Sequence, residues 1–97
     1  MYGTVARLRL KPGMMDKLRE FAAYEDGIKI PGHTGTIVYQ LDSDANEVIM
    51  VILFENKDAY LKNAESPEQD ARYQRFVALL DGAPEWNDGE IVYSHVG

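Results

Sequence analysis

The segment that most constrains the fold is residues 48–54, in which every position is apolar. Its composition favours a strand. An antiparallel strand with one face in water alternates apolar and polar residues, and this one does not. Protein must therefore cover both of its faces. A chain of 97 residues can supply helices for one face, so a second copy of the chain is the simplest cover for the other. The alternative is a central strand whose outer face stays partly exposed.

Two strands and one helix are expected before this segment. Residues 2–10 alternate as a half-buried strand does, with one side formed by Tyr2, Thr4, Ala6, Leu8 and Leu10. Residues 14–24 carry an apolar stripe at helical spacing, made by Met14, Leu18, Phe21 and Ala22. Gly27 is a helix stop signal, and the turn dipeptide Pro31-Gly32 opens a strand over residues 34–41. The polar loop 42–46 predicts a hairpin to the next strand.

Two helical segments and a strand are expected after it. Asn56 can cap a short helix that ends near residue 61. Ser66, Pro67 and Gln69 form the start signal of a longer helix, with Ser66 at the N-cap and Gln69 completing a capping box. Its inner stripe is Gln69, Tyr73, Phe76, Val77 and Leu80. Gly82 and Pro84 end it, and residues 90–96 alternate as a last strand.

The element order is therefore β-α-β-β-α-β within one domain that spans residues 1–97. Right-handed crossovers turn this order into a four-stranded antiparallel sheet with the helices on one side, an α+β, ferredoxin-like βαββαβ sandwich. The covered outer face of residues 48–54 predicts a homodimer.

Composition excludes several classes of function. The chain has no cysteine, which rules out disulfides, thiol nucleophiles and cysteine-bound metal clusters. A net charge of −6 argues against nucleic acid and anionic membranes as partners. No apolar run approaches the roughly 20 residues that span a bilayer, and the first residues lack a signal-peptide pattern. The cytoplasm is the expected compartment.

Three stretches carry a family resemblance: FENKDAY at 54–60, NAESPEQ at 63–69 and PEWNDGE at 84–90. They combine a strand ending in an acidic residue, a helix with an aromatic residue, a Ser-Pro helix start and an aromatic link to the last strand. Together with the length and the element order, they resemble the antibiotic biosynthesis monooxygenase (ABM) domain family over essentially the whole chain.

The resemblance implies a dimeric α/β barrel with a pocket between the sheet and the helices of each protomer. Some members oxidise phenols, quinols or anthrones with molecular oxygen and no cofactor. A deprotonated polyphenol can itself give an electron to oxygen, so the protein needs to bind, deprotonate and desolvate it. The resemblance thus implies a cofactor-independent monooxygenase acting on a small aromatic, quinol-like or polyketide-like compound. A non-catalytic dimeric module that binds a small molecule or a protein remains the alternative, and a lyase or isomerase of the same barrel type stays open.

Few residues are candidates for chemistry. His33, at the mouth of the second strand, could act as a general base near neutral pH, or it could be an exposed loop histidine. His95 lies near the end of the chain and is a weaker candidate. Four aromatic residues are the substrate-binding candidates, with core packing as the alternative: Tyr39, Tyr73, Trp86 and Tyr93.

Arg7 and Arg9 share one face of the first strand and could bind an anionic group, pair across a dimer, or simply be solvated. Asn63 resembles a polar helix position of some relatives, and we assign it no role. We expect no cofactor and no metal, because two distant histidines without carboxylates at ligand spacing form no metal site. Haem-degrading relatives hold the iron with a histidine on the second helical region. Residues 56–80 contain none, so we expect no haem.

Overall fold

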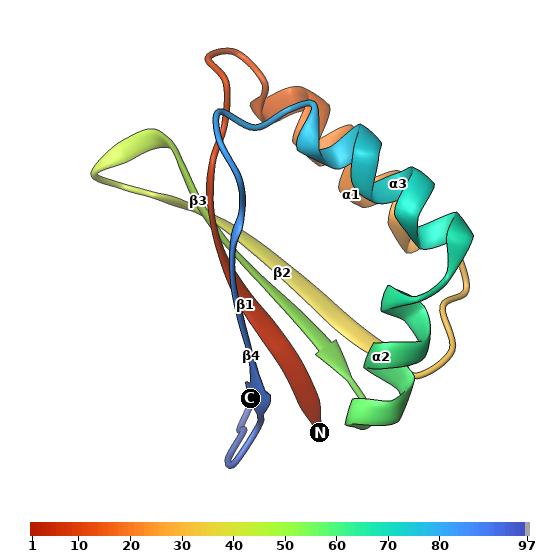
Figure 1. Cartoon of the computed structure of the whole chain (residues 1–97). Coiled ribbons are helices and arrows are strands. Elements are labelled where there is room, and N and C mark those ends of the chain that lie inside the picture. The colour runs from red at the N-terminus through yellow and green to blue at the C-terminus, as the bar shows by residue number, and fades with distance from the viewer. Residues whose placement is uncertain (97) are drawn as a thin grey trace.

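The computed structural model describes residues 1–96 as one α+β unit. Its elements, in chain order, are β1 (Tyr2–Arg9), α1 (Met15–Asp26), β2 (His33–Leu41), β3 (Asp44–Phe54), α2 (Lys57–Ala64), α3 (Pro67–Val77) and β4 (Glu85–Glu90). The four strands form one sheet in the order β2-β3-β1-β4, and each neighbouring pair is antiparallel. All the helices cover the same face of the sheet (Figure 1). The predicted ferredoxin-like fold is confirmed.

The core lies between the helices and the inner face of the sheet. The apolar side of β1 and the inner side of β3 lie next to each other in the sheet and face the helices. The buried strand residues include Ala6, Leu8, Val48 and Met50, and they pack against helix residues such as Leu18. The predicted inner stripe of α3 contributes buried Phe76, with Tyr73 and Val77 packed beside the cluster. The period-two and helical patterns therefore face each other across one apolar layer.

The β2–β3 hairpin and the helix starts follow the sequence signals. The connection is shorter than the polar loop 42–46 suggested, because Leu41 already pairs with Asp44. Asn56 caps α2 by accepting a hydrogen bond from the Ala59 amide at 2.8 Å. Ser66 caps α3 in the same way from the Gln69 amide at 3.3 Å. Within residues 1–96, no helix is long and apolar enough to cross a membrane.

The last strand lies earlier than expected. The prediction of a strand over residues 90–96 is wrong, because β4 occupies Glu85–Glu90 and pairs with β1 from Arg7 to Tyr2. Glu90 faces Tyr2, where β1 begins, so the residues beyond it reach past the neighbouring strand. Trp86, expected in a link, thus lies on a strand opposite Ala6. The segment after β4 leaves the sheet (Figure 1).

The outer face of the sheet is apolar at its centre. Val51 is flanked by Val5 on β1 and Ile37 on β2. Val5, Ile37 and the neighbouring Tyr39 are 45%, 54% and 50% exposed in this chain. The inner side of β3 is covered as predicted, whereas its outer side is only half-covered by the chain itself. Toward the hairpin the same face becomes charged, where Arg7 and Arg9 form ion pairs with Glu47 at 3.4 and 2.8 Å.

Candidate functional site

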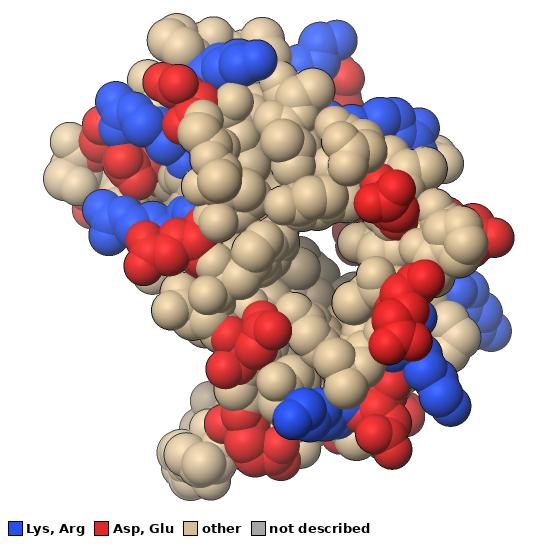
Figure 2. Space-filling model, viewed as in Figure 1, with Lys and Arg blue, Asp and Glu red and all other residues tan. Residues whose placement is uncertain are grey.

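A cavity of about 110 Å³ lies between the sheet and the helices. A space-filling view shows the molecule hollowed between these two layers (Figure 2). Most of the lining is apolar, and it comes from the inner face of β2 and β3, from α1 and from α3. Eight of the lining residues carry a polar side-chain group: Glu25, Asp26, His33, Thr36, Asn63, Gln69, Tyr73 and Trp86. Such a lining suits a flat aromatic ligand that a small number of polar contacts orient.

His33 is placed by the turn that precedes β2. Gly32 adopts a φ of +81°, which glycine permits at little cost, and a Cβ at this position would clash with the Cβ of Ala59. The chain therefore turns sharply and directs the next residue to the cavity. The imidazole Nε2 of His33 lies 2.7 Å from the Thr36 hydroxyl, and its ring packs edge-on against Phe54 with centroids 5.5 Å apart. These contacts fix the orientation of an ionisable ring at the cavity wall.

Glu25 brings a second ionisable group to the same wall. The pKa of its carboxyl is raised above the ordinary value. Burial is the larger effect and raises it, while the charges of Arg72, Arg75 and His33 partly oppose this shift. Its Oε2 atom lies 3.3 Å from Nε of Arg72. Glu25 follows Phe21 by four residues, so the apolar stripe of α1 continues into a carboxylate at the cavity.

Arg72 is the buried cation of this region, with a residue exposure of 8%. Its Nη2 donates to the side chain of Gln69 at 3.0 Å. Neither Glu25 nor Arg72 was named from the sequence, because charged side chains are usually solvated. The spacing was a usable signal, since Arg72 lies three residues after Gln69 and four before Phe76 on the inner stripe.

Aromatic rings form one side of the cavity. The ring centroid of Tyr73 lies 6.3 Å from that of Trp86 and 6.5 Å from that of Phe76. Phe76 in turn lies 5.6 Å from Phe21 on α1. This row joins α1, α3 and β4, so it can hold an aromatic ligand by stacking and edge contacts.

The structure brings together some of the predicted site residues. His33, Tyr73 and Trp86 line one cavity, and so does Asn63, to which we assigned no role from the sequence. Tyr39 lies on the outer face of the sheet, and Tyr93 is 82% exposed in the segment after β4. These two therefore lie away from the cavity of their own chain. Within residues 1–96, no cluster of three or more histidine, aspartate or glutamate side chains is arranged to hold a metal ion.

The fold and the cavity together define a ferredoxin-like α+β domain with a cavity between its sheet and its helices. The ABM family model, described as antibiotic biosynthesis monooxygenase, matches residues 1–78. The chain belongs to this family. No curated protein sequence matches it.

Several solved structures share the fold. SnoaB, a cofactor-independent oxygenase from Streptomyces nogalater, is 14% identical, with a TM-score of 0.78 over 96% of this chain and 94% of that one. A protein from Chloroflexus aurantiacus, described as a candidate antibiotic biosynthesis monooxygenase, is 20% identical with a TM-score of 0.78, over 98% and 96% of the two chains. A protein from Mycobacterium tuberculosis is 14% identical with a TM-score of 0.75, over 98% of each chain.

Proposed function

We propose that this protein is a cofactor-independent monooxygenase that oxidises a small aromatic, quinol-like or polyketide-like compound with molecular oxygen. The observation that carries the proposal is the mostly apolar, aromatic-walled cavity with His33 and Glu25 at its edge. Family membership supports it, as does a shared fold with SnoaB, which is described as a cofactor-independent oxygenase.

The chemistry asks little of the protein. His33 accepts a phenolic or benzylic proton, and the resulting anion passes one electron to oxygen. The substrate radical and superoxide combine to a hydroperoxide, which loses water to leave a carbonyl. One oxygen atom thus enters the substrate and the other leaves as water, so that the CH₂ carbon of an anthrone, or a ring C–H carbon of a phenol, becomes C=O. The apolar walls exclude bulk water, and the row of aromatic side chains aligns the ring.

We further propose that the working form is a cytoplasmic homodimer, with a small aromatic molecule as its ligand. The exposed apolar centre of the outer sheet face, with Val5, Ile37 and Tyr39 about half exposed, supports association of two copies through this face. The cavity opens on the opposite, helix-covered side of the sheet, so each protomer would keep a complete site.

Oxygen uptake tests the function directly. With a hydroquinone or an anthrone as substrate and a chelator present, the protein should accelerate oxygen consumption. The rate should rise with pH because the phenolate is the species oxidised. His33→Ala should lower the rate roughly 10²-fold or more, the usual effect of removing a general base. His95→Ala changes the only other histidine, which lies outside the cavity, and is the matched control.

Unchanged turnover in His33→Ala would remove this residue from the mechanism. No acceleration across a broad panel of quinols and polyphenols would instead favour the non-catalytic binding module.

A further inference from the structure

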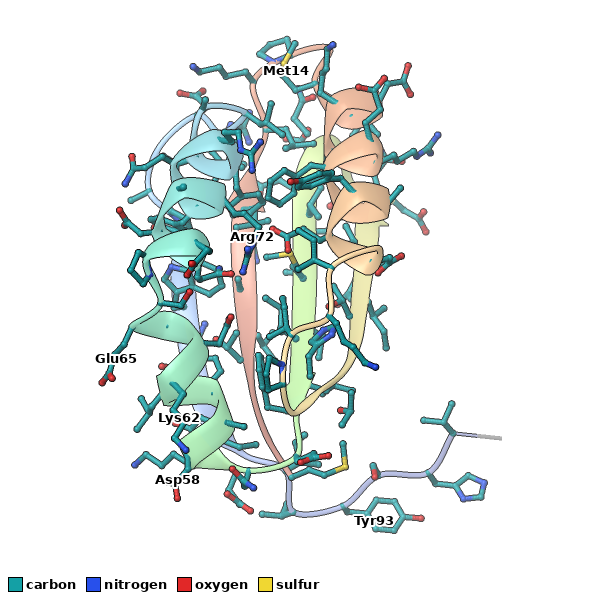
Figure 3. The ribbon with its side chains drawn as sticks, turned by 90° about the vertical axis from the view of Figure 1, so that its right-hand side faces the viewer. Met14, Asp58, Lys62, Glu65, Arg72 and Tyr93 are labelled. Atoms are coloured by element: carbon teal, nitrogen blue, oxygen red, sulfur yellow. The ribbon has the colours of Figure 1, made fainter. Side chains whose placement is uncertain are left out.

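A second hollow adjoins the cavity. It is a groove of about 720 Å³ between the α1–β2 connection on one side and α2 and α3 on the other. Asn63 lines both the groove and the cavity. Figure 3 looks onto this side of the molecule, with Asp58 and Lys62 on α2 and with Arg72 on α3 above them. The two hollows therefore meet at Asn63.

The size of the cavity limits what it can hold. Ligand sites usually have volumes of roughly 300–1,000 Å³, and an engineered apolar cavity of about 150 Å³ binds benzene. A cavity of about 110 Å³ therefore has room for one aromatic ring, and a fused ring system extends beyond it. The cavity and the groove taken together fall within the usual range. A ligand larger than one ring must extend into the groove.

Arg72 marks the boundary between the two hollows. It lines the groove, whereas its partners Glu25 and Gln69 line the cavity. The Nε–H of Arg72 is buried and, among residues 1–96, has no hydrogen-bond acceptor. The contact with Glu25 meets the distance of an ion pair at 3.3 Å but not the geometry of a hydrogen bond. A buried donor without a hydrogen-bond acceptor is costly. Because the Arg72 side chain lines the groove, an acceptor atom of a ligand beside this guanidinium would be stabilised.

The charges of the groove indicate the kind of group it accepts. Three cations and three carboxylates line it: Lys29, Lys62, Arg72, Glu55, Asp58 and Glu68. A charged substituent would meet like charges as well as opposite ones. A neutral substituent with many hydroxyl groups can donate to the carboxylates and accept from the cations, and it loses less hydration than an ion does.

We propose that the cavity and the groove form one site for a single-ring phenol that bears a neutral, hydroxyl-rich substituent such as a sugar. The ring occupies the cavity, the substituent lies in the groove, and Asn63 and Arg72 contact the link between them. The phenolic nature of the ring rests on the proposed function, which this inference deepens. The division of the ligand between cavity and groove rests on the geometry alone.

Calorimetric titration without oxygen tests the proposal, because binding is then measured apart from turnover. The probes are hydroquinone, its β-glucoside arbutin, the anion gentisate and the tricyclic anthrone dithranol. Arbutin should bind at least about tenfold more tightly than hydroquinone, a gain of about 1.4 kcal/mol that one or two net hydrogen bonds supply. Gentisate and dithranol should bind no better than hydroquinone. Equal affinity for arbutin and hydroquinone, or tightest binding of dithranol or gentisate, would overturn the proposal.

A charge-neutral double variant locates the substituent. Asp58→Ala with Lys62→Ala removes one carboxylate and one cation from the groove, and the affinity for arbutin should fall to that for hydroquinone. Lys17→Ala with Glu20→Ala removes an exposed pair from α1, whose atoms lie 3.8 Å apart and outside both hollows, and should leave both affinities unchanged. Undiminished arbutin binding in the groove variant would refute the assignment. If the preference for arbutin holds but no quinol consumes oxygen, the site stands and the oxygenase proposal fails.

Discussion

At the scale of single residues, Tyr60 connects α2 to the sheet. Its hydroxyl donates to Oδ1 of Asp88 on β4 at 2.9 Å. Its ring packs against Tyr2 and Phe54, with centroids 5.3 and 5.5 Å away. Burial and then the Asp88 carboxylate raise the pKa of this phenol to about 12. Phe54 also packs against His33. The aromatic cluster around Tyr60 therefore supports the position of His33, the candidate base.

The raised pKa of Tyr60 predicts an alkaline loss of stability. A folded-state pKa of about 12 against an ordinary value of 10 means that the unfolded chain ionises first. The contribution of this phenol is therefore complete below pH 10 and declines as the pH rises toward 12. Ultraviolet titration should resolve one of the six tyrosines at the higher pH. Asp88→Asn should lower that midpoint but leave it above 10, because burial remains.

The exposed carboxylate Asp42, changed to Asn, provides the control and should leave the Tyr60 midpoint in place. A single ultraviolet transition shared by all six tyrosines would contradict the assignment.

At the scale of elements, the two N-caps determine where α2 and α3 begin. These helices carry Asn63, Tyr73 and Arg72, so their starting points set the register of the site. The capping box at Ser66 is only half formed. The Ser66 hydroxyl accepts from the Gln69 amide, but the side-chain oxygen of Gln69 accepts from Arg72 instead of closing the box. The side-chain oxygen of Gln69, which a complete capping box would have used, therefore binds Arg72 beside the cavity.

Removing either cap should destabilise the protein measurably. Asn56→Ala and Ser66→Ala should each lower the free energy of unfolding by about 1 kcal/mol, the typical cost of losing an N-cap. The effect should be larger for Asn56, whose cap hydrogen bond is 2.8 Å against 3.3 Å for Ser66. Urea denaturation measures both. Ser43→Ala, an exposed serine in the hairpin turn, is the control, and equal losses in all three variants would argue against capping.

The elements show how far sequence patterns reach. Local signals predicted β1, β3, the hairpin and both caps, because period and capping chemistry are properties of neighbouring residues. They missed β4, because Asn87-Asp88-Gly89 is typical of a turn and only pairing with β1 makes it a strand. That pairing is a long-range contact that no local pattern contains.

The candidate site divides in the same way. Sequence patterns indicated His33, Tyr73 and Trp86 as candidates, and these residues share one cavity. Glu25 and Arg72 were missed, because charged residues are usually solvated and only the packing of α1 against α3 makes an ion pair between them. Tyr39 and Tyr93 were chosen because they are aromatic. Whether they reach the cavity depends on strand pairing, which places Tyr39 on the outer face of the sheet and ends β4 before Tyr93.

At the scale of the whole molecule, the two faces of the sheet differ in what covers them. The inner face carries the core and the cavity, and helices cover it (Figure 1). The outer face has Val51 at its centre, between Val5 and Ile37. A contiguous apolar patch on a small chain of net charge −6 is typical of an interaction surface. In the proposed homodimer, a second copy would bury this patch and would add buried area to the small core of a 97-residue chain.

The assembly prediction follows from this face. Light scattering at micromolar concentration should give about twice the chain mass of 11.0 kDa. Ile37→Lys should give the monomer mass. The residue is 54% exposed in the single chain, so the ammonium group of a lysine can reach water in the protomer but would be buried in the dimer. Leu61→Lys places the same charge at an apolar residue of α2 that is 42% exposed and should leave the dimer intact. A monodisperse monomer for the unmodified chain would refute the homodimer, and a dimer that survives Ile37→Lys would move the interface elsewhere.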